Sequence, residues 1–300
     1  MVTRRRFLAT ASLSSLSYLA ARHGEPARAT GAMQVGYAAI TWGANLTQAI
    51  EEIAAVGYRG IQLRGEAFAQ YGEKAGELRD LLERHKLTFA VLSSGNLSID
   101  PAREKEEIAT HTRHAQFVRD AGGKYLQIID ERPKGRPVVA DDYRRLGRLL
   151  TDLGKRTADL GIPLVYHHHM NSTGEKPEEV AAVLDAADRR HVRLLFDIAH
   201  YQQGGGDPVA AIRKYREWID VVHLKDVRDK SAATGGSGGY EFVELGRGRV
   251  DVPAALAALR EIGFDKWAIV ELDRVVDPGR TPKQSAEINK QYLSAHGVNV

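Results

Sequence analysis

The 300-residue sequence predicts an α/β protein, a (β/α)₈ barrel that forms one domain after the first 29 residues. Past residue 32, short apolar runs alternate with longer segments of helical periodicity, and the alternation reaches eight units. Eight strand and helix units in about 265 residues match the size of such a barrel. The apolar runs are nearly continuous, as expected for parallel strands that are covered on both faces.

The expected strands and helices follow one another regularly along the chain. The segment LTQAIEEIAAVG spaces Leu46, Ile50 and Ile53 as one helical face and ends at Gly57, a common helix stop. An open doubly wound sheet is the alternative, but the turn after the first strand, AAITWGANL, lacks the Gly-rich phosphate motif of that fold. The expected strands are residues 35–40, 60–64, 87–92, 124–129, 162–167, 192–196, 219–224 and 267–272.

One long loop interrupts this pattern after the seventh strand. Residues 228–250 include the Gly-rich stretch SAATGGSGGYEF. Loops of this length are usually active-site lids or disordered insertions. Because active sites in these barrels lie where the strands end, the position of the loop favours a lid.

Residues 1–29 are interpreted as a twin-arginine (Tat) signal peptide, which leaves residues 30–300 for the barrel domain. They contain an arginine run, a weakly apolar stretch rich in Ala and Ser, and the sequence ARA at its end. A basic disordered tail or a membrane anchor is the alternative, although the run from Phe7 to Ala21 is too short and polar to span a bilayer well. We therefore expect a periplasmic or secreted protein without stable membrane anchoring.

The basicity of the chain belongs to this N-terminal segment. The whole chain has 42 basic and 39 acidic residues, but residues 1–29 hold five arginines and one glutamate. The remaining 37 basic and 38 acidic residues form no clustered positive patch of the kind that nucleic-acid binding needs. The chain has no cysteine, which excludes disulfides, thiolate metal ligands and thiol catalysis.

Five of the eleven histidines fall at three adjacent strand ends, where the chemistry of such barrels lies. Two imidazoles and two carboxylates come one each from four consecutive strands and suit one divalent ion, namely Mn²⁺, Co²⁺, Zn²⁺, Fe²⁺ or Mg²⁺. If the fifth strand continues through its HHH sequence, His167 and His169 face one side and His168 the other. The candidate metal ligands are His167, Asp197, His223 and Glu271.

Other polar residues near the strand ends are candidates for catalysis or substrate binding. His169 and His200 would bind substrate hydroxyls or move protons, because imidazole titrates near neutral pH. Lys225 would stabilise a developing oxyanion or pair with a carboxylate. Further candidates for the substrate pocket are Trp42, Gln62 and Glu131, the last of which would otherwise face solvent.

The sixth and seventh strands resemble the D-x-x-H and H-L-K-D segments of the sugar phosphate isomerase/epimerase superfamily, the xylose isomerase-like TIM barrels. The matching segment reads LLFDIAHYQQGGGDPVAAIRKYREWIDVVHLKDVR. The segments YHHHMNST, ELGRGRVD and WAIVELD stand in the expected order around it. The resemblance covers essentially all of the chain after the N-terminal segment, and its motifs are most similar to those of inosose dehydratases.

This resemblance implies a divalent metal, most commonly Mn²⁺ or Co²⁺, that holds adjacent oxygens of a keto-sugar or cyclitol. The family motifs place Asp197, His223 and Glu271 among its ligands, whereas His167 stands where epimerases of the family have a glutamate. With the metal as Lewis acid, Glu271 or His169 would remove an α-proton and an enediolate would form.

The implied function is a metal-dependent isomerase or epimerase that acts on a keto-sugar, cyclitol or keto-glycoside. A lyase that eliminates a β-substituent, as an inosose dehydratase does, is the alternative on the same scaffold. A nuclease like endonuclease IV is more remote, because it needs further metal ligands where this chain has Gln62, Ser93 and Ser94. A non-catalytic sugar-binding barrel is equally remote, since the four candidate ligands are intact. The expected partner is a small sugar or cyclitol, and oligomer formation is left open.

Replacing Arg4 and Arg5 by lysine tests the export interpretation. Lysine keeps the positive charge but removes the arginine pair that defines a Tat signal. We expect the variant to accumulate in the cytoplasm, as measured by cell fractionation and immunoblotting. Unchanged secretion would count against the signal.

Overall fold

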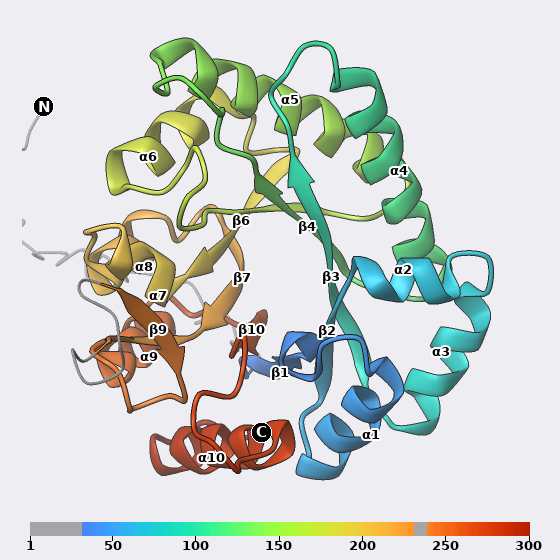
Figure 1. The fold of residues 1–300 in the computed structure, drawn as a ribbon, viewed down its shortest axis with the longest axis vertical. Helices are drawn as coiled ribbons and strands as arrows, with labels where there is room; N and C mark the ends of the chain where they lie inside the picture. The colour runs from blue at the N-terminus through green and yellow to red at the C-terminus, as the bar shows by residue number, and fades with distance from the viewer. Residues whose placement is uncertain (1–31, 231–238) are drawn as a thin grey trace, which may run out of the picture. The chain divides into compact units, whose positions relative to one another are not determined.

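The computed structural model describes residues 32–230 and 239–300, in which eight parallel strands close into a barrel (Figure 1). Strands that follow one another in sequence are neighbours in the barrel, so the expected (β/α)₈ fold is confirmed. The proposed signal peptide lies outside the described residues. The barrel strands are β1 (Gln34–Ala38), β2 (Gly60–Arg64), β3 (Thr88–Leu97), β4 (Tyr125–Asp130), β5 (Leu164–His167), β6 (Val192–Asp197), β7 (Ile219–Leu224) and β10 (Trp267–Val270).

The strands form where the sequence predicted them, with differences at their ends. The last residues of the first expected strand belong instead to a 3-10 helix, η1 (Ala39–Trp42). Strand β3 continues past its expected end at residue 92 and reaches Leu97. Its register with β4 shifts between Ser93 and Asn96, which marks a β-bulge. Such bulges redirect side chains and occur often beside active sites.

Helices surround the barrel and cover its strands (Figure 1). Helix α1 buries Leu46, Ile50 and Ile53, the face that the sequence predicted, and ends at Gly57 with a φ of 101°. Glycine adopts this left-handed conformation without a steric penalty. The helices are α1 (Leu46–Val56), α2 (Gly65–Tyr71), α3 (Ala75–Arg84), α4 (Glu104–Asp120), α5 (Ala140–Asp159), α6 (Pro177–Ala186), α7 (Ile198–Gln203), α8 (Pro208–Lys214), α9 (Val252–Glu261) and α10 (Pro282–Ala295).

The long loop after β7 contains a two-stranded antiparallel sheet of β8 (Asp226–Asp229) and β9 (Tyr240–Val243). The buried Asp226 carboxylate accepts four backbone N–H groups, and it organises the chain that follows β9 because three of these groups belong to that chain. The donors are Val227, Gly246, Gly248 and Val250. Residues 231–238 lie outside the described residues, so a lid there stays a prediction.

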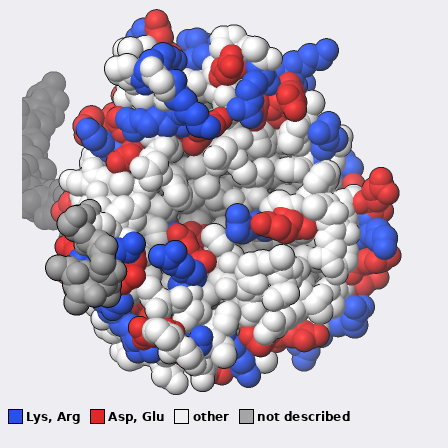
Figure 2. All heavy atoms as spheres, in the orientation of Figure 1, with Lys and Arg blue, Asp and Glu red and all other residues white. Residues whose placement is uncertain are grey.

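The surface carries charges of both signs. The face seen down the barrel is hollowed near its centre, and acidic and basic side chains stand around the hollow (Figure 2). Among the described large apolar side chains, Val139 is the one that is exposed. In the part of the chain that the structure describes, no helix is both long enough and apolar enough to cross a membrane.

Gly154 tests the packing of helix α5 against the chain that leads into β6. A Cβ at this position would overlap the backbone carbonyl of His191, which cannot move aside as a flexible side chain can. Gly154→Ala should therefore lower the free energy of unfolding by about 1–3 kcal/mol, the usual cost of overpacking. Urea denaturation followed by circular dichroism measures this change.

Gly76→Ala, in helix α3, is the matched control. The nearest atom to a Cβ at this position is the end of the Arg79 side chain, 3.8 Å away. Because alanine is the better helix former, this variant should be neutral or more stable by up to about 1 kcal/mol. Equal stability of the two variants would contradict the close approach at Gly154.

Candidate metal centre

The structure brings the four candidate metal ligands together at the carboxyl ends of the strands. His167 ends β5, Asp197 ends β6, His223 lies in β7, and Glu271 directly follows β10. All four side chains are buried, and one ligand atom from each lies within 4.8 Å of the others. The parallel register brings two of these ligands side by side, since Asp197 of β6 is paired with His223 of β7.

Three atoms of this cluster have no hydrogen-bond partner among the described residues, although they are buried. They are His167 Nδ1, Asp197 Oδ2 and His223 Nδ1. His223 Nδ1 lies 3.4 Å from Asp197 Oδ2 and 3.7 Å from Glu271 Oε2. A buried polar atom without a partner costs roughly 1–3 kcal/mol. A divalent cation between these atoms would satisfy them, so the donor set fits a metal ion.

Asp197 divides its two carboxylate oxygens between a helix and the site. Oδ1 accepts the backbone N–H groups of Ala199 and His200 at 2.8 Å each and caps helix α7, whereas Oδ2 has no hydrogen-bond partner in the part of the chain that the structure describes. Burial raises the pKa of Asp197, but His223 and Lys225 outweigh burial and hold this pKa below its usual value. The carboxylate is therefore available as an anionic ligand.

Gln62 holds two of the ligands in place. Its Oε1 accepts a hydrogen bond from His223 Nε2 at 2.9 Å, and its Nε2 donates to Glu271 Oε2 at 3.2 Å. Because a carbonyl oxygen can only accept, His223 donates from Nε2, and Nδ1 is the ring nitrogen that faces the cluster. Partners of this kind orient metal-bound histidines. Gln62, expected to bind substrate, thus acts on the ligands as well as lining the pocket.

Lys225 fixes Glu271 from the other side. Its buried ammonium donates to Glu271 Oε1 at 2.9 Å and to Asp273 Oδ1 at 2.6 Å, and lies 3.9 Å from the centre of the Phe242 ring. Burial lowers the pKa of Lys225, but the two carboxylates raise it further, so the group stays charged. Of the two roles expected for Lys225, the structure shows the pairing with carboxylates.

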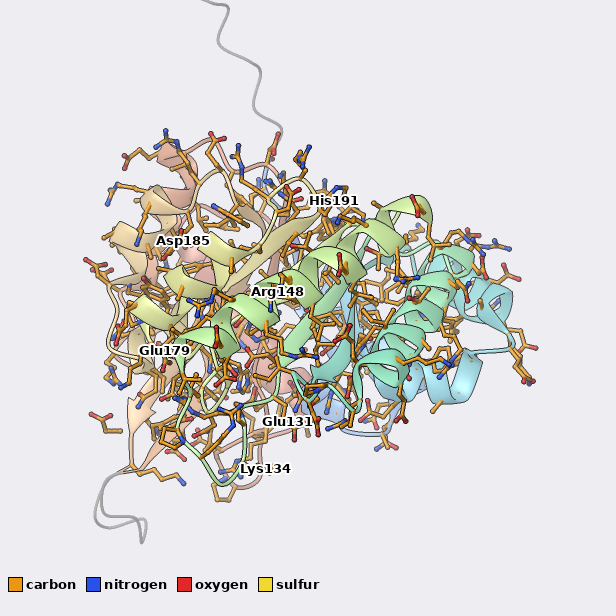
Figure 3. The ribbon with its side chains drawn as sticks, turned by 90° about the horizontal axis from the view of Figure 1, so that it is seen from above. Glu131, Lys134, Arg148, Glu179, Asp185 and His191 are labelled. Carbon is orange, nitrogen blue, oxygen red and sulfur yellow. The ribbon has the colours of Figure 1, made fainter. Side chains whose placement is uncertain are left out.

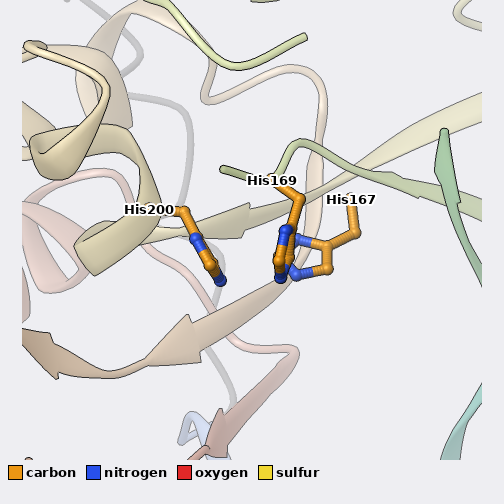
Figure 4. Close-up of side chains that lie close together, drawn as sticks. All are labelled: His167, His169 and His200. Atoms are coloured by element: carbon orange, nitrogen blue, oxygen red, sulfur yellow. The ribbon is translucent and has the colours of Figure 1, made fainter. Parts of the chain in front are cut away.

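His169 and His200 lie beside His167 (Figure 4), with 3.8 Å between the centres of the His169 and His200 rings, whose planes are tilted by 40°. His169 Nδ1 donates to the Met170 carbonyl at 2.7 Å, so Nε2 is the ring nitrogen that this hydrogen bond leaves unused. Both nitrogens of the buried His200 face N–H donors, Met170 N and Lys225 Nζ, at 3.3 Å. Burial, and then Lys225, lower the pKa of His200, which is therefore neutral.

His168 faces away from the cluster, as the alternation along the strand predicted. Its Nε2 accepts the backbone N–H of Asp197 at 3.1 Å, and its ring packs among Phe196 and Tyr201. The sequence offered no role for His168, because this contact joins side chain and backbone across two strands. The residue supports the position of Asp197.

A pocket of about 400 Å³ opens onto the cluster. His167, His169 and Glu271 line it, so the face of β5 that carries both histidines is turned toward substrate. Further residues of β2, β3 and β4 line the pocket, and the sequence assigned no substrate-binding role to them. These are Arg64, Ser94, Asn96 and Gln127.

His200, also expected to bind substrate, is buried and is not among the residues that line the pocket. The structure places two further expected substrate-binding residues elsewhere. Trp42 is buried in the hydrophobic core, where its Nε1 donates to Glu52 Oε2 at 2.7 Å. Glu131 pairs with Arg103 at 2.9 Å and with Lys134 at 3.2 Å in the loop below helix α5 (Figure 3). Glu131 lines a separate cavity between the loops that follow β3 and β4.

The fold and the site together define a class of protein, the (β/α)₈ barrels with a buried centre of two histidines and two carboxylates at their strand ends. Residues 50–293 match the family described as xylose isomerase-like TIM barrel, and the chain belongs to that family. The predicted resemblance is therefore confirmed.

Two relatives align with most of the chain. Inosose dehydratase of Lacticaseibacillus casei is 29% identical over 275 residues, which cover 83% of this chain and 88% of the relative. Rhizopine catabolism protein MocC of Rhizobium meliloti is 32% identical over 272 residues, which cover 83% of this chain and 81% of the relative. Names of enzymes among the relatives confirm the expectation that the protein is an enzyme of this superfamily.

Solved structures show the same fold. The structure of IolI protein with a bound zinc atom has a TM-score of 0.72 at 20% identity and covers 88% of this chain and 98% of its own. The structure of a D-tagatose 3-epimerase-like protein has a TM-score of 0.72 at 17% identity and covers 88% of this chain and 97% of its own. At these identities the likeness concerns the fold alone.

Removing one imidazole of the cluster tests the metal centre. We expect one divalent ion per chain in the wild-type protein, and a more than tenfold weaker retention of that ion in His223→Ala. Gln62→Leu leaves the four ligands in place but frees two of them to turn, so its metal affinity should fall by about 10–100-fold. Elemental analysis after dialysis against a chelator measures both effects.

His85→Ala is the control, since it removes an imidazole at the end of helix α3, away from the cluster. It should retain metal as the wild type does. Wild-type protein that binds no divalent ion even after reconstitution would contradict the metal centre.

Proposed function

We propose that the protein is a divalent-metal-dependent lyase. It removes the α-proton of a keto-sugar, cyclitol or keto-glycoside and expels a β-hydroxyl or β-alkoxyl group. The observation that carries this proposal is the imidazole of His167 at the end of β5. The family resemblance implies that epimerases have a second glutamate at this place, and epimerisation by two bases needs both carboxylates. Elimination needs only one base and an acid, and the relatives named inosose dehydratase support it.

The ion would be held by His167, Asp197, His223 and Glu271. When bound, it supplies Lewis acidity at a substrate carbonyl oxygen and so makes the neighbouring C–H more acidic. Two nitrogen and two oxygen donors suit Mn²⁺ or Co²⁺, which the family resemblance favours, and also Zn²⁺ or Fe²⁺; Mg²⁺ fits the oxygen donors but not the imidazoles. We propose Mn²⁺ or Co²⁺.

His169 is the base that the geometry favours. It lines the pocket, and its Nδ1–H is bound to the Met170 carbonyl, so the Nε2 lone pair is free to accept a proton. Both oxygens of Glu271 are instead engaged, by Lys225 on one side and Gln62 on the other. Glu271 thus serves as a ligand, and His200, buried behind the His169 ring, supports that ring.

Isomerisation or epimerisation is the second candidate. A second carboxylate, that of Asp273, also lines the pocket and is held by Lys225. A base on that side would return a proton to the α-carbon or to its neighbour instead of letting a β-substituent leave. The two reactions share their first step and differ in the fate of the carbanion.

The pocket supports an unphosphorylated substrate. Among the described residues that line it, Arg64 is the one Lys or Arg, and it lies 3.7 Å from Glu66. Phosphate groups are usually held by several convergent cations or N–H donors. Export through the Tat pathway, which we also propose, would bring the enzyme to unphosphorylated sugars.

Incubation in D₂O with a panel of inososes, keto-sugars and 3-keto-glycosides tests the proposed reaction. We expect deuterium at the α-carbon of at least one substrate, detected by NMR, because proton abstraction precedes elimination. Release of water or alcohol identifies a lyase, and a rearranged sugar identifies an isomerase. Absence of exchange with every member of the panel would contradict the proposal.

His169→Asn tests the base. The variant should lose about 10²–10⁴-fold in the rate of α-proton exchange, the usual contribution of a general base. Its metal content should equal that of the wild type, because His169 is not among the four ligands. Exchange at the wild-type rate would transfer the role to Glu271.

A further inference from the structure

A second polar cluster lies against the wall of the same pocket. Ser94 lines the pocket, and its Oγ lies 2.6 Å from His111 Nδ1 and 2.7 Å from His114 Nδ1. His111 Nε2 lies 3.3 Å from Glu107 Oε2 and has no hydrogen-bond partner among the described residues. Ser94, His111 and Glu107 are all buried. The cluster thus forms a polar chain from the pocket into helix α4.

The backbone places these groups. Glu107, His111 and His114 are spaced four and three residues apart, so they share the face of helix α4 that turns toward β3. Ser94 lies in the bulge of β3, beside Gly95, whose φ of 99° is left-handed. The bulge directs the Ser94 hydroxyl between the helix and the pocket.

The hydrogen-bond capacity of Ser94 decides where its proton points. A hydroxyl has one donor position and two acceptor positions. The two imidazoles occupy two of these three positions. When both rings donate from Nδ1, the hydroxyl hydrogen is left for the third direction, on the side of the pocket.

We propose that Glu107, His111 and Ser94 form a proton relay that protonates the departing β-oxygen of the substrate. The inference rests on the proposed elimination and supplies the acid that this reaction needs. Ser94 would be the catalytic residue, since its hydroxyl lines the pocket. His111 and Glu107 act through it.

Each relay step conserves protons and electrons. The β-oxygen takes the Ser94 hydroxyl proton as its bond to carbon breaks, and it leaves as water or an alcohol with that electron pair. His111 passes its Nδ1 proton to Ser94 Oγ and receives the Glu107 carboxyl proton at Nε2. The electron pair of the α-C–H bond becomes the new double bond. After the product leaves, Ser94 takes a proton from solvent in the pocket and passes its own to His111 Nδ1, while the Nε2 proton returns to Glu107, so the relay is restored.

The electrostatics agree with this direction of transfer. Burial raises the pKa of Glu107, against the opposing effect of Arg103, so the carboxyl group holds its proton more readily than usual. Burial, with a contribution from His114, lowers the pKa of His111 to about 4. A neutral imidazole therefore faces the carboxyl group, as a relay by tautomer exchange requires.

The test compares two rates in Ser94→Ala and in Glu107→Gln. The relay acts after α-proton removal, so deuterium exchange at the α-carbon should stay within about threefold of wild type, while elimination falls by about 10²–10³-fold. A 3-keto-glycoside with a 4-nitrophenoxide leaving group needs no proton, so its elimination should fall by less than about tenfold. Thr112→Ala, which removes a hydroxyl bonded to Ile108 O on the same helix, is the control for a disturbed α4 and should match wild type.

Equal losses of exchange and elimination in Ser94→Ala would overturn the relay, and so would unchanged elimination. Absence of exchange in the wild type refutes the proposed function itself, which is a different result. One measurement needs no substrate, because ¹⁵N NMR of the His111 ring reports its protonation. A neutral ring at pH 7 supports the relay, and a doubly protonated ring overturns it.

Discussion

The parallel register of β5, β6, β7 and β10 is the constraint on which the site depends. It brings a ligand residue from each of these neighbouring strands to one edge of the barrel. The side chains enter a buried space in which three of their atoms find no hydrogen-bond partner among the described residues. Folding thus brings metal-ligand atoms without hydrogen-bond partners to one point, and a bound cation would offset the cost of burying them. We therefore expect metal binding and the stability of this barrel edge to be coupled.

A second set of contacts keeps the ligands from satisfying one another. Gln62 holds His223 and Glu271, Lys225 holds the other oxygen of Glu271, and the N-cap bonds of helix α7 hold one oxygen of Asp197. These contacts also separate the residues that hold the metal ligands from the residue that can take a proton. The two oxygens of Glu271 are held by Lys225 and Gln62, whereas His169 lines the pocket and its Nε2 is not used in the hydrogen bond to Met170.

The pocket is chemically asymmetric. His167, His169, Glu271 and Asp273 line the pocket on the side of β5 and β10, and Ser94 with its two imidazole partners lies on the side of β3. An elimination has the same asymmetry, since one group removes a proton from carbon and another delivers a proton to oxygen. The two walls therefore match the two halves of the proposed reaction.

The sequence by itself determined the fold and the candidate metal ligands. Eight nearly continuous apolar runs separated by helical segments fit few architectures other than a closed parallel barrel. Because the chemistry of such barrels lies at the strand ends, the sequence also indicates the candidate ligands, which are His167, Asp197, His223 and Glu271. The tertiary structure decided how the other residues are used. Trp42 lies near a strand end but is buried in the core, and Glu131 lines a separate cavity. Gln62 accepts a hydrogen bond from His223 across the barrel. Ser94 reaches the histidines of helix α4 only because β3 bulges. Such roles depend on side-chain direction and on contacts between distant segments, which the periodicity of a sequence does not encode.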